Sequence, residues 1–128
     1  MTLVLDSGGL SALAARRALL VELRNRGQWP AQVPSVVLAE ALTGDHRRDV
    51  AVNRVLRACQ VRLVDEMHAR EAARLRTATG RAGTIAATDA LVAALASIVA
   101  DPVVVTSDPI DLTALVAHAA RDIAVVAV

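Results

Sequence analysis

Hydrophobic residues along the chain alternate between short apolar runs and longer mixed segments. The short runs are rich in valine and leucine, whereas the longer segments repeat apolar residues every three or four positions, the spacing of one helix face. The short runs predict strands at residues 2–5, 31–34, 61–64, 103–106 and 123–128. The mixed segments between them predict helices.

The helical segments have recognisable starts and ends. Residues 10–26 predict one long or two short helices after a turn at residues 6–9, and Ser35 is expected to cap a helix that continues through Glu40 to about Thr43. Further helices are predicted to carry residues 52–59, to cover residues 66–79, to begin at residues 88–89, and to run from Pro109 to about Ala120.

The alternation of strands and helices predicts an α/β fold. Strands separated by helices pair in parallel through right-handed crossovers, so we expect a sheet of about five parallel strands with helices on both faces. The strands are apolar along their whole length, which is typical of strands covered on both sides. The chain has 128 residues, the size of a single domain, so residues 1–128 are expected to share one core.

Composition narrows the classes of function. Trp29 is the only aromatic residue, so nucleic-acid binding by stacked rings is excluded. All 14 basic residues are arginine, which excludes chemistry that needs a lysine amine, and the net charge of +1 points to no partner. Cys59 is the only cysteine and falls on an apolar helix face, where a buried thiol is expected. The longest apolar stretch, residues 86–100, is too short to cross a membrane, and we expect a cytoplasmic protein.

Acidic residues follow the predicted strands and begin the predicted helices. Ligands bind at the carboxyl ends of strands in open parallel sheets, where these acids are expected to meet. The acids are Asp6, Glu40, Asp89, Asp108 and Asp111. Each has a structural interpretation, since Asp108 before Pro109 is a good helix cap and Asp89 suits a first helical turn. As a group they would repel one another without a cation, and oxygen ligands suit Mg²⁺ or Mn²⁺. Such a site favours phosphodiester hydrolysis.

The sequence resembles the PIN-domain ribonucleases, and among them the VapC toxins of prokaryotic VapBC toxin–antitoxin systems. The matching stretches are LVLDSGGLSAL, PSVVLAEALTG, ATDALVAALA and VVVTSDPIDL, in the family's order. The resemblance implies a three-layer α/β/α PIN-like fold, catalytic residues Asp6, Glu40, Asp89 and Asp108, and a metal site built by these four with Asp111 as a possible fifth ligand. Thr106 and Ser107 match the family's usual small hydroxyl residue. Leu112 stands where many relatives have an aromatic residue, which leaves open whether Asp108 or Asp111 is the principal last ligand.

The same resemblance implies an activity and partners. We expect a Mg²⁺-dependent endoribonuclease, with Mn²⁺ able to substitute, that cuts single-stranded RNA and leaves 5′-phosphate and 3′-hydroxyl ends. It also implies a homodimer and inhibition by a VapB-like antitoxin. Arginine can bind RNA phosphates through paired hydrogen bonds, with no need for aromatic side chains. Seven arginines are expected near the site: Arg16, Arg17, Arg24, Arg26, Arg47, Arg48 and Arg81. Any one of them also fits a solvated helix face.

Three other classes of protein place acids at the same edge of a sheet. Phosphorelay receivers and haloacid-dehalogenase-type phosphatases rely on a lysine, which this chain lacks. A noncatalytic PIN-like module, or another acidic α/β module that binds RNA or protein, remains the alternative. Such a module would be expected to have lost one of the acids, and none is lost here.

Overall fold

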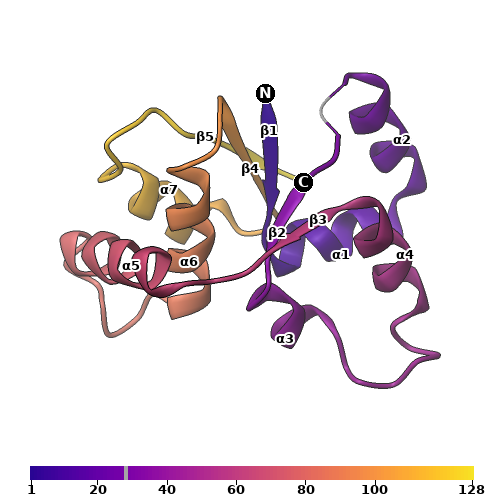
Figure 1. Ribbon diagram of the computed structural model, residues 1–128, viewed down its shortest axis with the longest axis horizontal. Coiled ribbons are helices and arrows are strands. Elements are labelled where there is room, and N and C mark those ends of the chain that lie inside the picture. The colour runs from indigo at the N-terminus through magenta and orange to yellow at the C-terminus, as the bar shows by residue number, and fades with distance from the viewer. Residues whose placement is uncertain (28) are drawn as a thin grey trace.

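The computed structural model describes residues 1–27 and 29–128, and a sheet of five parallel strands forms its centre (Figure 1). The strands are β1 (Thr2–Leu5), β2 (Gln32–Pro34), β3 (Gln60–Arg62), β4 (Pro102–Thr106) and β5 (Ala124–Ala127). Their order across the sheet is β3-β2-β1-β4-β5, and every neighbouring pair is parallel. The strand order therefore changes direction at β1 and β4, the position in open α/β sheets where ligands bind.

Helices cover both faces of this sheet, which confirms the predicted three-layer α/β/α architecture. The helices are α1 (Ser7–Ala15), α2 (Arg17–Asn25), α3 (Val37–Ala41), α4 (Val50–Ala58), α5 (Glu66–Ala78), α6 (Ala87–Ala96) and α7 (Pro109–Val116). Figure 1 shows α1, α2 and α4 on one side of the strands and α5, α6 and α7 on the other. Among the described residues, no helix is long and apolar enough to span a membrane.

Leucine, valine and alanine fill the core in place of aromatic side chains. Leu3, Leu5 and Val104 are buried in the two central strands, and residues 92–96 of α6 are all buried. Helix α6 contacts β1, β2 and β4 as well as α5 and α7, so it is enclosed by the sheet and by its neighbouring helices. Its many alanines allow this close approach, because a small side chain lets backbones pack tightly. The first turn of α6, which carries Asp89, is thereby brought to the central strands.

Two predicted helix starts are wrong. Residues 6–9 do not form a turn ahead of the first helix, since α1 already begins at Ser7 and the carboxylate of Asp6 caps it. The Ser35 side chain does not cap the next helix, since α3 begins at Val37 and has no side-chain cap. Ser35 instead accepts a backbone hydrogen bond from the Leu38 amide through its carbonyl oxygen. Residues 10–26 form the two short helices that were one of the two alternatives.

Other predicted boundaries shift at the edges of the sheet. The third strand ends at Arg62 rather than residue 64, and the side chain of Leu63 is 81% exposed. Helix α7 ends at Val116, four residues before the predicted end. Full coverage of every strand is also wrong, because β3 and β5 are edge strands and leave Val61 and Val126 partly in solvent. Edge strands lack a neighbour on one side, so their apolar sequence does not imply burial.

Candidate metal centre

Asp6 lies at the point where the central strand β1 ends, and its carboxylate is almost completely buried. The register pairs Leu5 with Val105, so Asp6 lies beside Thr106 at the end of β4. The Thr106 hydroxyl donates to Oδ2 of Asp6 at 2.5 Å, and the Gly9 amide donates to Oδ1 at 2.6 Å. Burial raises the pKa of Asp6, and the charge of Glu40 raises it further, against the lowering effect of these two hydrogen bonds. The carboxylate is therefore held firmly but is not fully compensated.

The glycine pair after Asp6 allows helix α1 to start against strand β4. A Cβ atom on Gly9 would lie 2.1 Å from the carbonyl oxygen of Val105, and one on Gly8 would lie 2.0 Å from Oγ of Ser107. No larger residue fits between this helix and the strand without a shift of the backbone at Gly9. The glycines thus set the distance at which Asp6 meets Thr106.

Glu40 reaches the same region from α3. The Ser7 hydroxyl, in the first turn of α1, donates to Oε2 of Glu40 at 3.1 Å. Glu40 itself is exposed to solvent and lies inside the helix, as the sequence predicts. This contact joins residues 33 positions apart and connects α3 to the first turn of α1, next to the end of β1.

Asp89 is the carboxylate on which the charges of the other acids converge. Burial raises the pKa of Asp89 to about 6, and the charges of Asp6, Glu40, Asp111 and Asp108 raise it in that order of size. A charge acts in this way only over a short range, so the structure brings all five predicted acids into one electrostatic neighbourhood. These charge effects on Asp89 are what the predicted convergence of the acids would produce.

Asp108 and Asp111 have different partners in the first turn of α7. The Asp108 carboxylate accepts from the Ile110 amide at 3.4 Å and caps the helix, while the Asp108 amide donates to the Thr106 hydroxyl at 3.1 Å. Asp111 forms an ion pair with Arg81, with 2.8 Å between Nη2 and Oδ1. Asp108 is exposed, so its carboxylate is open to a ligand on the solvent side.

The residues fit a hydrated divalent cation better than a closed metal cage. In residues 1–27 and 29–128, no three acidic, histidine or cysteine side chains are grouped closely enough to hold a metal ion directly. The charges that raise the pKa of Asp89 all come from carboxylates, and of these, within the described residues, only Asp111 is paired with an arginine, Arg81, so the remaining negative charge favours a bound cation. Mg²⁺ keeps several waters and binds proteins through one or two carboxylates, so this open oxygen-rich arrangement suits it.

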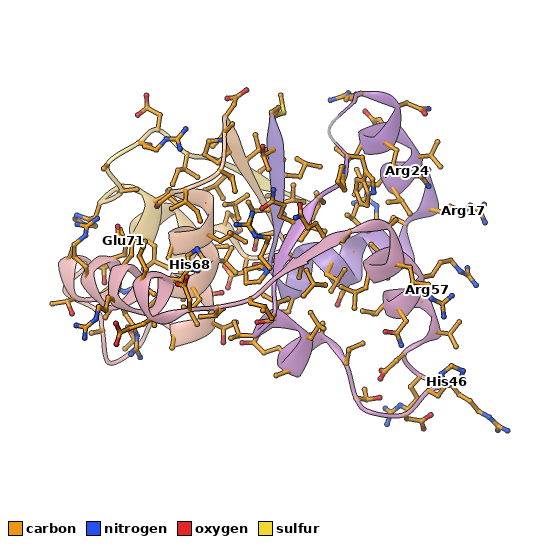
Figure 2. The ribbon with its side chains drawn as sticks, in the orientation of Figure 1. Arg17, Arg24, His46, Arg57, His68 and Glu71 are labelled. Carbon is orange, nitrogen blue, oxygen red and sulfur yellow. The ribbon has the colours of Figure 1, made fainter. Side chains whose placement is uncertain are left out.

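The remaining reactive side chains lie outside this arrangement. Burial raises the pKa of the Cys59 thiol to about 12, which leaves it protonated and unreactive at neutral pH. Figure 2 shows Arg17, Arg24, Arg57 and His46 on the side of α2 and α4, and His68 and Glu71 on α5. Of the seven arginines expected near the site, Arg81 forms an ion pair with one of the acids.

Sequence reasoning missed two carboxylate contacts. Asp49 lies in the polar stretch of residues 45–49, yet it is 5% exposed and accepts bonds from Thr43 and Gly44. The Arg81–Asp111 pair joins residues 30 positions apart. Neither contact has a local sequence signal, because both depend on where loops fold back in space.

Comparisons with known proteins agree with the architecture. A model of the PIN-domain family matches residues 4–115. The fold is similar to that of a DNA-bound VapBC from Salmonella typhimurium, with 18% identity, a TM-score of 0.73, and 99% of this chain and 98% of that chain covered. It is also similar to VapBC-1 from nontypeable Haemophilus influenzae, with 14% identity, a TM-score of 0.70 and the same coverage of 99% and 98%.

A third solved structure is VapBC2 from Rickettsia felis, bound to a DNA fragment from its promoter. It has 18% identity and a TM-score of 0.66, with 88% of this chain and 92% of that chain covered. A comparison with curated protein sequences gives no match.

Proposed function

The chain belongs to the PIN-domain family, and from that premise we propose that it is a VapC-like toxin, a cation-dependent endoribonuclease that cuts single-stranded RNA. The observation that carries the proposal is the electrostatic state of Asp89, whose pKa is raised to about 6 by burial and by the surrounding carboxylates. A bound cation stabilises the charged form of a carboxylate that is buried among other negative charges. The same cation, placed beside a phosphodiester, favours hydrolysis of that bond. We propose the cytoplasm as the site of action.

The carboxylates that we propose to hold the cation, one or two of them directly and the others through its bound waters, are Asp6, Asp89 and Asp108, with Glu40 nearby. A bound Mg²⁺, or Mn²⁺ in its place, would supply an activated water and would balance charge on the phosphoryl group, leaving 5′-phosphate and 3′-hydroxyl ends. The protein's own part is positioning. Thr106 and Gly9 fix both oxygens of Asp6, and Ser7 orients the carboxylate of Glu40. Fixed carboxylates lower the cost of reorganisation when substrate arrives.

A separate groove supports a VapB-like antitoxin as the protein partner. The groove has a volume of about 170 Å³, lies between α2 and α4, and combines an apolar floor with Arg17, Arg24 and Arg54. Residues 1–62 hold nine arginines against five acidic residues, whereas residues 63–128 hold five against eight. An acidic, amphipathic segment of a partner would complement the groove. The similar structures from S. typhimurium, R. felis and H. influenzae are all VapBC proteins.

The proposal includes a homodimer. Leu63, directly after β3, and Met67, in the first turn of α5, are four positions apart in the sequence and are 81% and 73% exposed. Apolar side chains of this size are uncommon on a fully solvated surface when they lie together, and a second copy of the chain would bury them.

The test is cleavage of a labelled single-stranded RNA oligonucleotide by the purified protein. We expect cleavage with Mg²⁺ or Mn²⁺, no cleavage with excess EDTA, and 5′-phosphate product ends that a phosphatase removes. A double-stranded RNA of the same sequence is the matched control substrate. Intact RNA under every cation condition would favour the alternative, a noncatalytic PIN-like module that only binds RNA or protein.

Cation binding gives a second, activity-independent check of the same proposal. A ligand that binds only the folded state stabilises it by about 1.4 kcal/mol at a tenfold excess over its Kd. We therefore expect Mg²⁺ to raise the Tm by a few degrees, and we expect Asp6→Asn to remove this increase. An equal increase in the variant would place the cation elsewhere.

A further inference from the structure

The ion pair between Arg81 and Asp111 differs from the other arginine ion pairs in the structure. Arg81 lies in the loop between α5 and α6, and its Nη2 atom is 2.8 Å from Oδ1 of Asp111 in α7. In the part of the chain that the structure describes, the other arginine–carboxylate pairs join residues three or four positions apart along one helical segment: Arg26–Glu22, Arg70–Glu66 and Arg74–Glu71. The Arg81 pair alone connects two separate elements, and its carboxylate belongs to the acidic cluster around Asp89.

The backbone of Arg81 is held as firmly as its side chain. Its amide donates to Oγ1 of Thr79 at 3.1 Å, and its carbonyl oxygen accepts from the amides of Thr84 at 2.9 Å and Ile85 at 3.0 Å. The loop therefore fixes one end of the residue and Asp111 fixes the other. An arginine fixed in this way loses little further conformational entropy when it binds a ligand.

The guanidinium keeps free donors on its solvent side. It has five N–H groups, and across residues 1–27 and 29–128 its one hydrogen bond to the protein is the bond to Asp111. The side chain is 45% exposed, so the remaining donors face water. Fixed guanidinium donors match the oxygens of a phosphate group, with which arginine forms two parallel hydrogen bonds. Around this arginine the site consists of carboxylates, which repel a phosphate.

We propose that Arg81 binds a backbone phosphate of the RNA next to the cleavage site, and that Asp111 is the positioning residue that holds Arg81 there rather than a cation ligand. The inference rests on the proposed ribonuclease function and extends it to a substrate contact. It also assigns different roles to the two acids of α7. Asp108 is open to a cation, whereas Asp111 already has a cationic partner in Arg81.

RNA binding by three arginine variants tests the phosphate contact. Affinity for a single-stranded RNA oligonucleotide is measured by fluorescence anisotropy in Ca²⁺ buffer, with a gel to show that the RNA stays intact. Loss of a charge-assisted hydrogen bond pair predicts that Arg81→Met weakens binding by about tenfold, and that Arg81→Lys restores part of it. The slope of log Kd against log salt concentration should fall by about 0.7, the value for one lost phosphate contact on a single strand.

Arg74→Met is the matched control for these measurements. Arg74 also forms an ion pair at 2.6 Å, with Glu71, and is 51% exposed, but its partner is outside the acidic cluster. The control should leave both the affinity and the salt slope unchanged. If Arg81 only ties the loop to α7, Arg81→Met will lower the Tm and leave the salt slope unchanged, which would overturn the proposal.

Asp111→Asn separates the two roles of Asp111 by the sign of its effect. Removing a negative charge near bound RNA strengthens binding if charge alone matters, whereas loss of the Arg81 anchor weakens it. We expect weaker binding, and no further loss when Arg81→Met is added, because both changes remove the same contact. Tighter RNA binding by Asp111→Asn would overturn the positioning role.

Mn²⁺ affinity, measured by electron paramagnetic resonance without RNA, tests the ligand assignment. Asp108→Asn should weaken Mn²⁺ binding more than tenfold, and Asp111→Asn should change it less than about threefold, because the Asp111 carboxylate is already paired with Arg81 and does not ligate the cation. A tenfold loss in Asp111→Asn would make it a ligand and overturn the proposal. A wild-type protein that binds no RNA would overturn the proposed function together with the phosphate contact, whereas unchanged RNA binding by Arg81→Met would overturn the contact alone.

Discussion

Two aspartates of the chain are buried to the same degree and are in opposite electrostatic states. Asp49 is 5% exposed and Asp6 is 6% exposed. Asp49 accepts bonds from the amides of Thr43 and Gly44 and from the Thr43 hydroxyl at 2.8 to 3.1 Å, and the Thr43 amide is the largest of the effects that lower its pKa. Burial raises the pKa of Asp6, and the neighbouring Glu40 adds to it.

The difference lies in what surrounds each carboxylate. The loop around Asp49 supplies N–H and O–H donors, and the charge of Arg48 also lowers the pKa of Asp49, so the carboxylate charge is satisfied by the protein itself. At the end of the sheet, Asp6 accepts two hydrogen bonds but also has further carboxylates nearby. Its negative charge is therefore not balanced by the protein, and a bound cation would balance it. Burial alone therefore does not mark a functional acid. A buried acid whose neighbours raise its pKa is a candidate functional residue.

Activity should show the largest contrast between the two regions. We expect Asp6→Asn and Asp89→Asn to lower kcat for RNA cleavage by roughly a thousandfold, the several kcal/mol that cation-assisted charge balance supplies. Asp49→Asn, the same change at a buried aspartate outside the cluster, should keep kcat within about threefold. Cleavage rates at saturating RNA, with circular dichroism to show that each variant is folded, make the comparison. Equal losses at Asp49 and Asp89 would remove the distinction.

The sequence predicts the position of Asp6 at the end of the sheet, but it does not predict the burial of Asp49. Asp6 and Asp108 follow apolar runs, and the parallel topology that these runs predict puts the ends of β1 and β4 side by side. Asp49 sits in the stretch TGDHRRD, whose polar residues look like any solvated loop. It is buried because the chain turns back at Gly44, with φ of 84°, and directs two amides at the carboxylate. This loop conformation is local, but the pattern of polar residues does not reveal it.

Asp49 should matter for stability, although it is not expected to matter for activity. Asp49→Ala leaves the amides of Thr43 and Gly44 without their acceptor, so we expect the Tm to fall by on the order of 5 °C. Asp122→Ala, at an exposed aspartate, should leave the Tm unchanged and is the matched control. Differential scanning calorimetry at pH 7 with EDTA measures both. A Tm for Asp49→Ala within a degree of wild type would mean that solvent replaces the lost acceptor.

The smallest expected effect is a change of stability with pH, and its sign differs between the regions. The pKa of Asp89 is raised to about 6 in the folded protein from 3.8, so between these values the folded state holds a proton that the unfolded state releases. Stability that Asp89 contributes below pH 3.8 is therefore lost as the pH rises through 6. Asp89→Asn cannot ionise and escapes this loss.

The difference in free energy of unfolding between Asp89→Asn and wild type reports this effect together with the charge coupling of Asp89 to its neighbouring acids, because the groups outside that cluster titrate alike in both proteins. We expect it to move in favour of the variant by about 1 kcal/mol between pH 4 and pH 7, a value reduced for the partial solvent exposure of the group. Asp49, whose pKa is lowered, stabilises the fold at neutral pH and loses that contribution only as the pH falls below 3.8. Urea titrations in EDTA measure both, and a deficit of Asp49→Asn that grows rather than shrinks on acidification would contradict the assignment of Asp49 as the satisfied carboxylate.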